Sequence, residues 1–87
     1  MIEDISVPEG VTIIDDYAFD NCIYLQHVEL PKSLKTMGSK VFGNCSNLKE
    51  IHYSGSKEDW WNMQRYGNWH EDSAITTVHC NDGDLKV

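Results

Sequence analysis

Two consecutive segments of this chain carry the same pattern at a fixed offset of 23 residues, without a gap. The first segment begins at Val7 and the second at Leu30. Equivalent positions hold identical or similar side chains: Pro8/Pro31, Val11/Leu34, Ile14/Met37, Ala18/Val41, Phe19/Phe42, Asn21/Asn44, Cys22/Cys45, Leu25/Leu48 and Val28/Ile51. A period of this length indicates a solenoid, in which each coil buries its apolar side chains against its neighbours.

The repeated pattern is Pro-x-x-(Val/Leu)-x-x-(Ile/Met)-x-x-x-(Ala/Val)-Phe-x-Asn-Cys-x-x-Leu-x-x-(Val/Ile). It resembles the BspA-like leucine-rich repeat of bacterial and some protist proteins, over residues 2 to about 83. The resemblance implies a coiled chain with one parallel strand per repeat, which this family uses for recognition and not for catalysis. It also implies that residues 54–83, where Gly-x-Lys-x-x-Trp precedes Val-His-Cys-x-Asp-Gly, form a C-terminal closing unit.

The expected fold is therefore a short leucine-rich-repeat solenoid that forms a single domain over residues 1–87. Residues 1–7 supply only the strand of a partial first repeat, residues 8–53 hold two repeats, residues 54–83 form a capping repeat, and residues 84–87 are a frayed tail. We expect parallel strands near 5–7, 28–30, 51–53 and 78–80. In the cap, a helix is predicted near 57–65, because Ser56 is a suitable N-cap and Gly67 a suitable stop.

Within each repeat, proline closes the strand because it cannot donate to a strand ladder. Residues 11–14, and more weakly 34–37, suit a second short extended segment, and a single helical turn is expected at 17–19 and 40–42. Cys22 and Cys45 hold the same place in successive repeats, so we expect both to be buried, reduced thiols that pack as small apolar side chains.

Charge and length limit the possible partners. The net charge is −7, from 14 acidic and 7 basic residues. An acidic chain is a poor ligand for a phosphate backbone, which needs clustered Lys and Arg, so direct nucleic-acid binding is not expected whereas a basic protein partner is compatible. The first residues have neither a basic nor an apolar leader segment, and no stretch approaches the roughly 20 apolar residues of a membrane span. These features predict a cytoplasmic location without membrane contact.

Neither a metal nor a catalytic site is predicted. His27, His52 and His79 with Cys80 suggest zinc ligands, but the chain has no Cys-x-x-Cys pair and no two histidines at helical i, i+4 spacing. No nucleophile with a base and no phosphate-binding glycine loop stands out. The chain is therefore expected to be non-enzymatic and to need no cofactor.

Candidate binding residues lie on the outward side of the strands. Two columns are expected to cross the sheet, with Asp4, His27, Glu50 and Thr77 in one and Ser6, Glu29, His52 and His79 in the other. This alignment places His27 beside Glu50 and Glu29 beside His52, as pairs of opposite charge when the imidazoles are protonated. The columns are either a solvated strand face or a recognition surface.

Two further groups are candidates. Asp15, Asp16 and Asp20 form an acidic cluster on the convex side, which a basic partner could recognise. Trp60, Trp61, Tyr66 and Trp69 lie close in sequence and either cover the end of the core or stack on sugars or exposed bases, with Trp61 the residue most expected to be exposed.

These features leave more than one function open. The first is a protein-protein interaction module that binds through the strand face or the acidic surface. The second is a phage-encoded acidic inhibitor of a host defence nuclease, of the anti-CRISPR type, and the third is a carbohydrate-binding or surface-adhesion module. The chain also begins inside a repeat, so the end formed by Ile2, Ile5 and Val7 is expected to form a homodimer, to be covered by a partner, or to continue from a longer parent.

Overall fold

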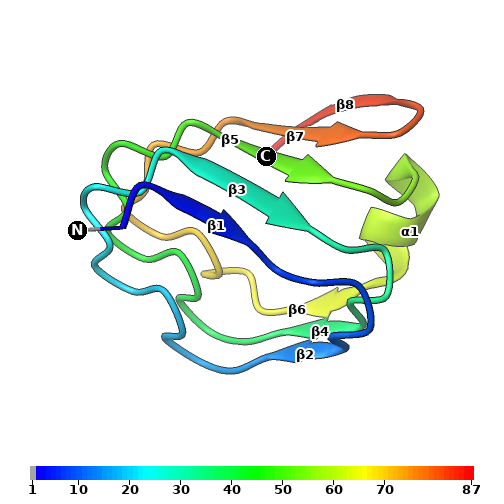
Figure 1. The fold of residues 1–87 in the computed structure, drawn as a ribbon, viewed down its shortest axis with the longest axis horizontal. Coiled ribbons are helices and arrows are strands. Elements are labelled where there is room, and N and C mark those ends of the chain that lie inside the picture. The colour runs from blue at the N-terminus through cyan, green and yellow to red at the C-terminus, as the bar shows by residue number, and fades with distance from the viewer. Residues whose placement is uncertain (1) are drawn as a thin grey trace.

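The computed structural model describes residues 2–87, and Met1 of the predicted segment 1–7 lies outside them. The chain winds so that two sheets lie on opposite sides of each coil (Figure 1). The larger sheet has the order β1 (Asp4–Ser6), β3 (His27–Leu30), β5 (Glu50–Tyr53), β7 (Thr77–Cys80) and β8 (Gly83–Lys86). The smaller sheet has the order β2 (Ile13–Ile14), β4 (Thr36–Met37) and β6 (Gln64–Arg65), and one helix, α1 (Lys57–Asn62), follows β5. The predicted leucine-rich-repeat solenoid is confirmed.

The 23-residue offset in the sequence is the register of the strands. Ile5 pairs with Val28 between β1 and β3, and Ile14 pairs with Met37 between β2 and β4, both in parallel. The bonding between coils continues through the turns, where the Phe19 N–H donates to the carbonyl of Val41 at 2.9 Å. Equivalent residues therefore stack around most of the coil, as the sequence predicted.

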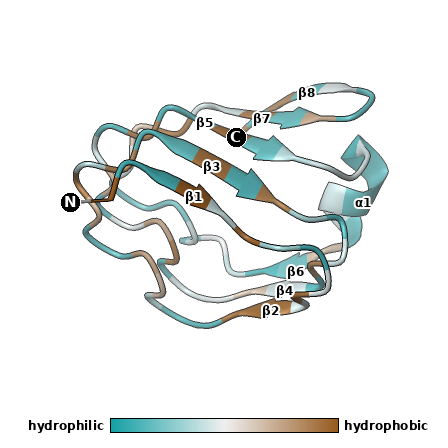
Figure 2. Ribbon diagram, in the orientation of Figure 1, coloured by the Kyte–Doolittle hydropathy of each residue, from teal (hydrophilic) through white to brown (hydrophobic). Residues whose placement is uncertain are grey.

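The apolar core is a spine between the two sheets. Along β1 and β3, hydrophobic residues alternate with hydrophilic ones (Figure 2), as expected for strands with one buried and one solvated face. The side chains of Val28, Ile51 and Val78 are completely buried at equivalent positions of successive strands. Burial of side chains of this size contributes about 1.5–3 kcal/mol each, so the spine is the main stabilising feature of the fold.

The turns between the sheets differ from the prediction. Residues 17–19 and 40–42 form turns and not helical turns. Tyr17 and Lys40 have φ of 61° and 52°, in the left-handed region that interrupts a right-handed helix. Hydrogen bonds from one coil to the next determine the backbone conformation of these turns. A local sequence pattern does not predict such bonds.

The helix is confirmed but is shorter than predicted. Ser56 and Asp59 form a capping box, in which Ser56 Oγ accepts from the Asp59 N–H and Asp59 Oδ2 accepts from the Ser56 N–H, both at 3.0 Å. The helix ends at Asn62 because Met63 is extended, with φ −69° and ψ 134°. The next residues form β6, which pairs with β4, so tertiary pairing replaces the helical continuation to residue 65.

The prediction of a frayed tail at 84–87 was wrong. After a two-residue turn, Gly83–Lys86 folds back as β8 and pairs with β7 in antiparallel register, with Cys80 opposite Gly83. Gly83 has φ of 134°, which an L side chain rarely adopts. β8 also covers Thr77, which was expected on the exposed face but is 7% exposed, and Lys86 Nζ donates to Thr77 Oγ1 at 3.1 Å.

Candidate binding surfaces

The exposed side of the larger sheet carries a compact array of imidazoles and carboxylates, which we call the strand face. β3 and β5 bury alternate residues, so the side chains between these residues point to solvent, and His79 of β7 lies in register with His52 on the same face. The residues of the strand face are His27, Glu29, Glu50, His52 and His79. All five were predicted from the alternation of the strands.

The pairing within the strand face differs from the prediction. The register does place Glu29 beside His52, but the carboxylate of Glu29 contacts His27 of its own strand, with Oε2 at 3.0 Å from Nε2. Residues i and i+2 of a strand share a face, so an imidazole that leans along the strand reaches this partner. The imidazoles instead pack across the strands, with ring centroids 4.9 Å apart for His27 and His52 and 5.0 Å apart for His52 and His79.

His79 lies between two carboxylates. Its Nε2 is 2.9 Å from Glu50 Oε2, and its Nδ1 is 2.7 Å from Asp84 Oδ1. The hydrogen bond to Glu50 and then the one to Asp84 raise the pKa of His79, while the hydrogen bond from His79 lowers the pKa of Glu50. When protonated, His79 donates from both ring nitrogens, so the three side chains hold each other in place.

Asp84 is not among the residues that the sequence predicts for this face, because residues 84–87 were predicted to be frayed. The signal was present as an Asn-Asp-Gly turn followed by the alternation Asp84-Leu85-Lys86, in which only Leu85 packs against the core. An apolar residue between two polar ones after a tight turn is typical of a hairpin return strand.

Asp4 and Ser6 lie on the same face but at its outer edge. They are in register with His27 and Glu29 respectively, and both are exposed. Within residues 2–87, neither side chain makes a hydrogen bond or ion pair to the strand face. The structure therefore places them beside the array without joining them to it.

The acidic residues of the convex side, Asp15, Asp16 and Asp20, differ in exposure and in their contacts. Asp15 is exposed, while Asp16 Oδ1 accepts from the Ser39 N–H at 2.7 Å in the next coil. Asp20 is half-buried, and its Oδ1 is buried without a hydrogen-bond partner in the described part of the chain. Two of the three carboxylates thus point toward the neighbouring coil, which leaves Asp15 as the most accessible.

The aromatic residues of the cap divide between core and surface. Trp60 is fully buried and Trp69 nearly so, whereas Trp61 is 59% exposed and Tyr66 61% exposed. The Arg65 guanidinium lies 5.0 Å from the ring centroids of both Trp60 and Trp61, and burial lowers the pKa of Arg65. The predicted core role holds for Trp60, and the predicted exposure holds for Trp61.

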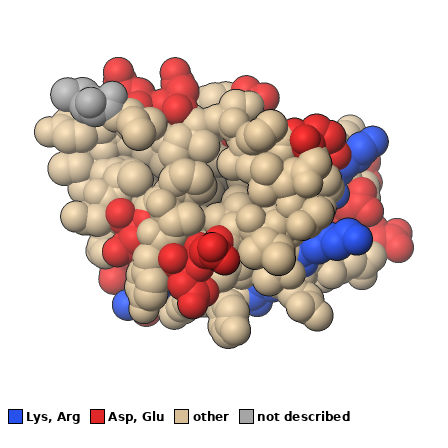
Figure 3. Space-filling model, turned by 60° about the horizontal axis from the view of Figure 1, so that its bottom comes forward, with Lys and Arg blue, Asp and Glu red and all other residues tan. Residues whose placement is uncertain are grey.

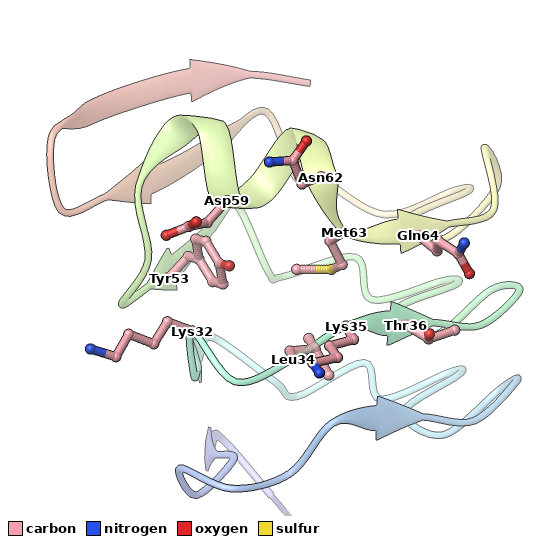
Figure 4. A pocket seen from close by; sticks show the side chains of 9 residues that line it. All are labelled: Lys32, Leu34, Lys35, Thr36, Tyr53, Asp59, Asn62, Met63 and Gln64. Atoms are coloured by element: carbon pink, nitrogen blue, oxygen red, sulfur yellow. The ribbon is translucent and has the colours of Figure 1, made fainter.

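Two hollows flank this cap. One, of about 580 Å³, is lined by both exposed aromatic residues together with Arg65, His70 and Lys86. The other, of about 480 Å³, lies between α1 and the second coil, where Leu34 and Met63 face each other while the Lys32 amine points away (Figure 4). Their lining is mixed and open to solvent, and no pair of side chains in them has the geometry of a nucleophile with its base.

Metal-ligating side chains are not grouped in residues 2–87, where no three of His, Cys, Asp and Glu are arranged to hold an ion. In the same part of the chain, the model contains no helix with the length and apolar character needed to cross a bilayer.

Parallel strands repeated at a fixed period, with a continuous apolar spine, define a leucine-rich-repeat solenoid. Residues 1–64 match the family model described as BspA type leucine rich repeat region (6 copies), and the chain belongs to this family. The family indicates a protein-protein interaction module and is typically non-catalytic. No curated protein and no solved structure matches the chain.

Proposed function

We propose that this chain is a non-enzymatic module that binds a protein partner, and that the strand face takes part in binding. The observation that supports this proposal most directly is the mutual support of the exposed side chains. His79 is held by Glu50 and Asp84, and His27 is held by Glu29, at distances of 2.7 to 3.0 Å. Side chains ordered before binding lose less conformational entropy when a partner arrives, so such a face suits recognition.

The chemistry of the strand face favours a partner with basic or hydrogen-bond-donating groups. Glu29 and Glu50 are about half exposed, with side-chain exposures of 60% and 51%, so their carboxylates remain accessible beside the imidazoles. Arg or Lys of a partner would meet these carboxylates, while the flat imidazole stack offers contact area at low entropic cost. We propose that this binding takes place in the cytoplasm, which is the location that the sequence predicts.

Site-specific photo-crosslinking tests this function in a lysate of the native host. A crosslinking residue is placed at His52 on the strand face and, as a matched control, at Gln64, which is also exposed but lies on the smaller sheet. We expect a discrete adduct from position 52 that unlabelled wild-type protein displaces and that Glu29→Gln/Glu50→Gln protein displaces poorly. Equal adduct yields from both positions would contradict the assignment of binding to the strand face.

A carbohydrate-binding or adhesion role is a second candidate, favoured by the larger hollow at the cap. Its exposed Trp61 and Tyr66 offer ring faces, and Arg65 and Lys86 offer donors, with no Asp or Glu in the lining. Titration of tryptophan fluorescence with neutral and acidic oligosaccharides tests this candidate, with Trp61→Ala as the variant that should lose the response. The role of a phage-encoded nuclease inhibitor rests on acidity and size and stays a prediction.

A further inference from the structure

Within residues 2–87, the first coil, residues 2–24, has a neighbouring coil on one side only, so one end of the apolar spine is less covered than the rest. Each spine position can be compared with its equivalent 23 residues later, where a coil covers both sides. Phe42 and Cys45 are completely buried, whereas the equivalent Phe19 and Cys22 are only partly buried. Likewise, Ile5, Val7 and Val11 are partly buried where their equivalents Val28, Leu30 and Leu34 are buried, and Ala18 is exposed where Val41 is buried.

The same end also presents free backbone groups along β1. The Val7 N–H donates to the Glu29 carbonyl at 3.0 Å, and the Glu3 carbonyl accepts from the His27 N–H at 3.1 Å, so residues 3, 5 and 7 direct their backbone groups toward β3. In a parallel ladder these groups alternate sides, so Asp4 and Ser6 direct theirs toward the open edge. An edge of this kind is a template for another strand.

The charge of the chain is concentrated at this end. The first coil, residues 2–24, contains six acidic residues and no Lys or Arg, whereas residues 25–87 contain eight acidic and seven basic residues. The first coil thus carries six of the seven net negative charges. Acidic groups surround the face that contains β2, and Lys and Arg lie mainly toward its right margin (Figure 3). Within residues 2–87, Glu3, Asp4, Glu9 and Asp15 form no ion pair, so their charges are not neutralised.

We propose that the open face of the first coil docks a basic partner protein through a strand that adds to the β1 edge. The partner strand would place apolar side chains over the exposed spine beside Ile5 and Val7, and Lys or Arg beside Asp4. This inference rests on the proposed protein-binding function and names the partner's chemistry and a second contact surface.

The charge distribution disfavours a second copy of this chain as the molecule that docks at the first coil. A two-fold dimer through Ile2, Ile5 and Val7 would bring together two ends that each carry six acidic residues and no Lys or Arg. Like charges at a shared interface oppose association, and opposite charges favour it. The homodimer expected from the sequence is therefore the competing outcome of the test below.

A short synthetic peptide in which Lys alternates with Val serves as the probe. Binding to the full chain is measured by fluorescence anisotropy at low and at high salt, and the site is located by NMR amide shifts. We expect binding that weakens with salt, shifts in the amides of Asp4 and Ser6, and no binding of the same peptide with Glu in place of Lys. A peptide N-methylated at alternate residues, which cannot donate to the edge, should bind much more weakly.

Matched variants separate docking at this end from general attraction to an acidic protein. Glu3→Gln/Asp4→Asn/Glu9→Gln and Glu58→Gln/Glu71→Gln/Asp72→Asn change the net charge equally, but only the first set lies on the first coil. The first should weaken binding on the order of tenfold at low salt, since it removes three exposed charges from the docking end, and the second should have little effect. Ser6→Pro removes an outward N–H without breaking the pairing with β3 and should also weaken binding.

Four results would overturn the inference. Equal weakening by both triple variants would show non-specific attraction, and unchanged binding of the N-methylated peptide would exclude strand addition. A dimer in light scattering that protects the Asp4 and Ser6 amides would identify a second copy as the occupant. Loss of peptide binding in Glu29→Gln/Glu50→Gln alone would move the site to the strand face, in which case this inference fails and the proposed function stands.

Discussion

Phe19 and Phe42 stack on each other in successive coils, with ring centroids 5.5 Å apart and planes inclined by 16°. Phe42 is completely buried and also packs against Trp69, whereas Phe19 is only partly buried. The same residue in the same place of the repeat therefore has a different environment, because one coil has neighbours on both sides and the other on one side.

Phe42→Ala should accordingly destabilise the fold far more than Phe19→Ala. Truncation of a fully buried Phe costs about 3–5 kcal/mol, through lost apolar contact and the cavity left behind, and we expect roughly half of that at Phe19. Urea unfolding followed by circular dichroism measures both. Equal losses would show that the first coil is covered in solution, for example by self-association.

The cysteines should differ in the same way. Burial raises the pKa of Cys45 to about 11, so its thiol stays protonated at neutral pH, and its Sγ lies 3.3 Å from the carbonyl oxygen of Phe19. Cys22, which the sequence predicted to be equally protected, is partly exposed at the open end. With Cys80→Ser as the background, a thiol reagent should modify Cys22 well before Cys45, and Cys45 should react only on unfolding.

The contact between His79 and Glu50 predicts a specific pH dependence of stability. His79 has a raised pKa, so its contribution is fully present below the ordinary value of 6.5 and is lost as the pH rises through the raised value. Glu50 has a lowered pKa, so its contribution is present above 4.5 and is lost as the pH falls through the lowered value. Wild-type protein should therefore exceed Glu50→Gln in stability most clearly between pH 4.5 and 6.5.

NMR titration of the imidazole provides the direct measurement. Glu50→Gln should lower the pKa of His79, although Asp84 still faces it, and Glu58→Gln should leave it unchanged because Glu58 lies on α1. An unchanged pKa of His79 in Glu50→Gln would rule out this pairing in solution.

Position 43 is predicted to require glycine, because a side chain of the preceding coil lies against it. A Cβ at this position would lie 2.5 Å from Asp20 Oδ1, so Gly43→Ala forces the carboxylate or the backbone to move. We expect a loss of about 1–3 kcal/mol in unfolding free energy, in the range for overpacked sites. Gly67→Ala is the matched control, since a Cβ there has no neighbour within 4 Å. Asp20→Ala should restore much of the loss in a double variant.

The sequence predicted what depends on the repeat and missed what depends on contacts between repeats. The offset of the repeat, for example between Pro8 and Pro31, was enough to predict the coil, the strand register and the buried face of the strands. A fixed period is this informative because equivalent residues of successive repeats stack on each other. The outward residues of the strand face followed from alternation alone. Trp60 and Trp61 were assigned correctly because helical spacing places them on different sides of α1.

The errors share one physical origin. Tyr17 takes a left-handed conformation because its N–H bonds to Ser39 of the next coil, and Met63 leaves the helix because β6 pairs with β4. Likewise, Glu29 contacts His27 of its own strand and not His52, its partner in the register, because the side-chain rotamers and not the register decide this contact. Tertiary contacts determine these conformations, and a short segment of the sequence does not reveal tertiary contacts.

The antiparallel return of β8 makes the two ends of the solenoid unequal. Within residues 2–87, β8 runs antiparallel to β7 and occupies the edge on which a further parallel strand would lie, whereas no strand pairs with the outer edge of β1. We therefore expect a further coil to stack at the β1 end only. Complexes formed in this way should have fixed stoichiometry and should not extend into filaments.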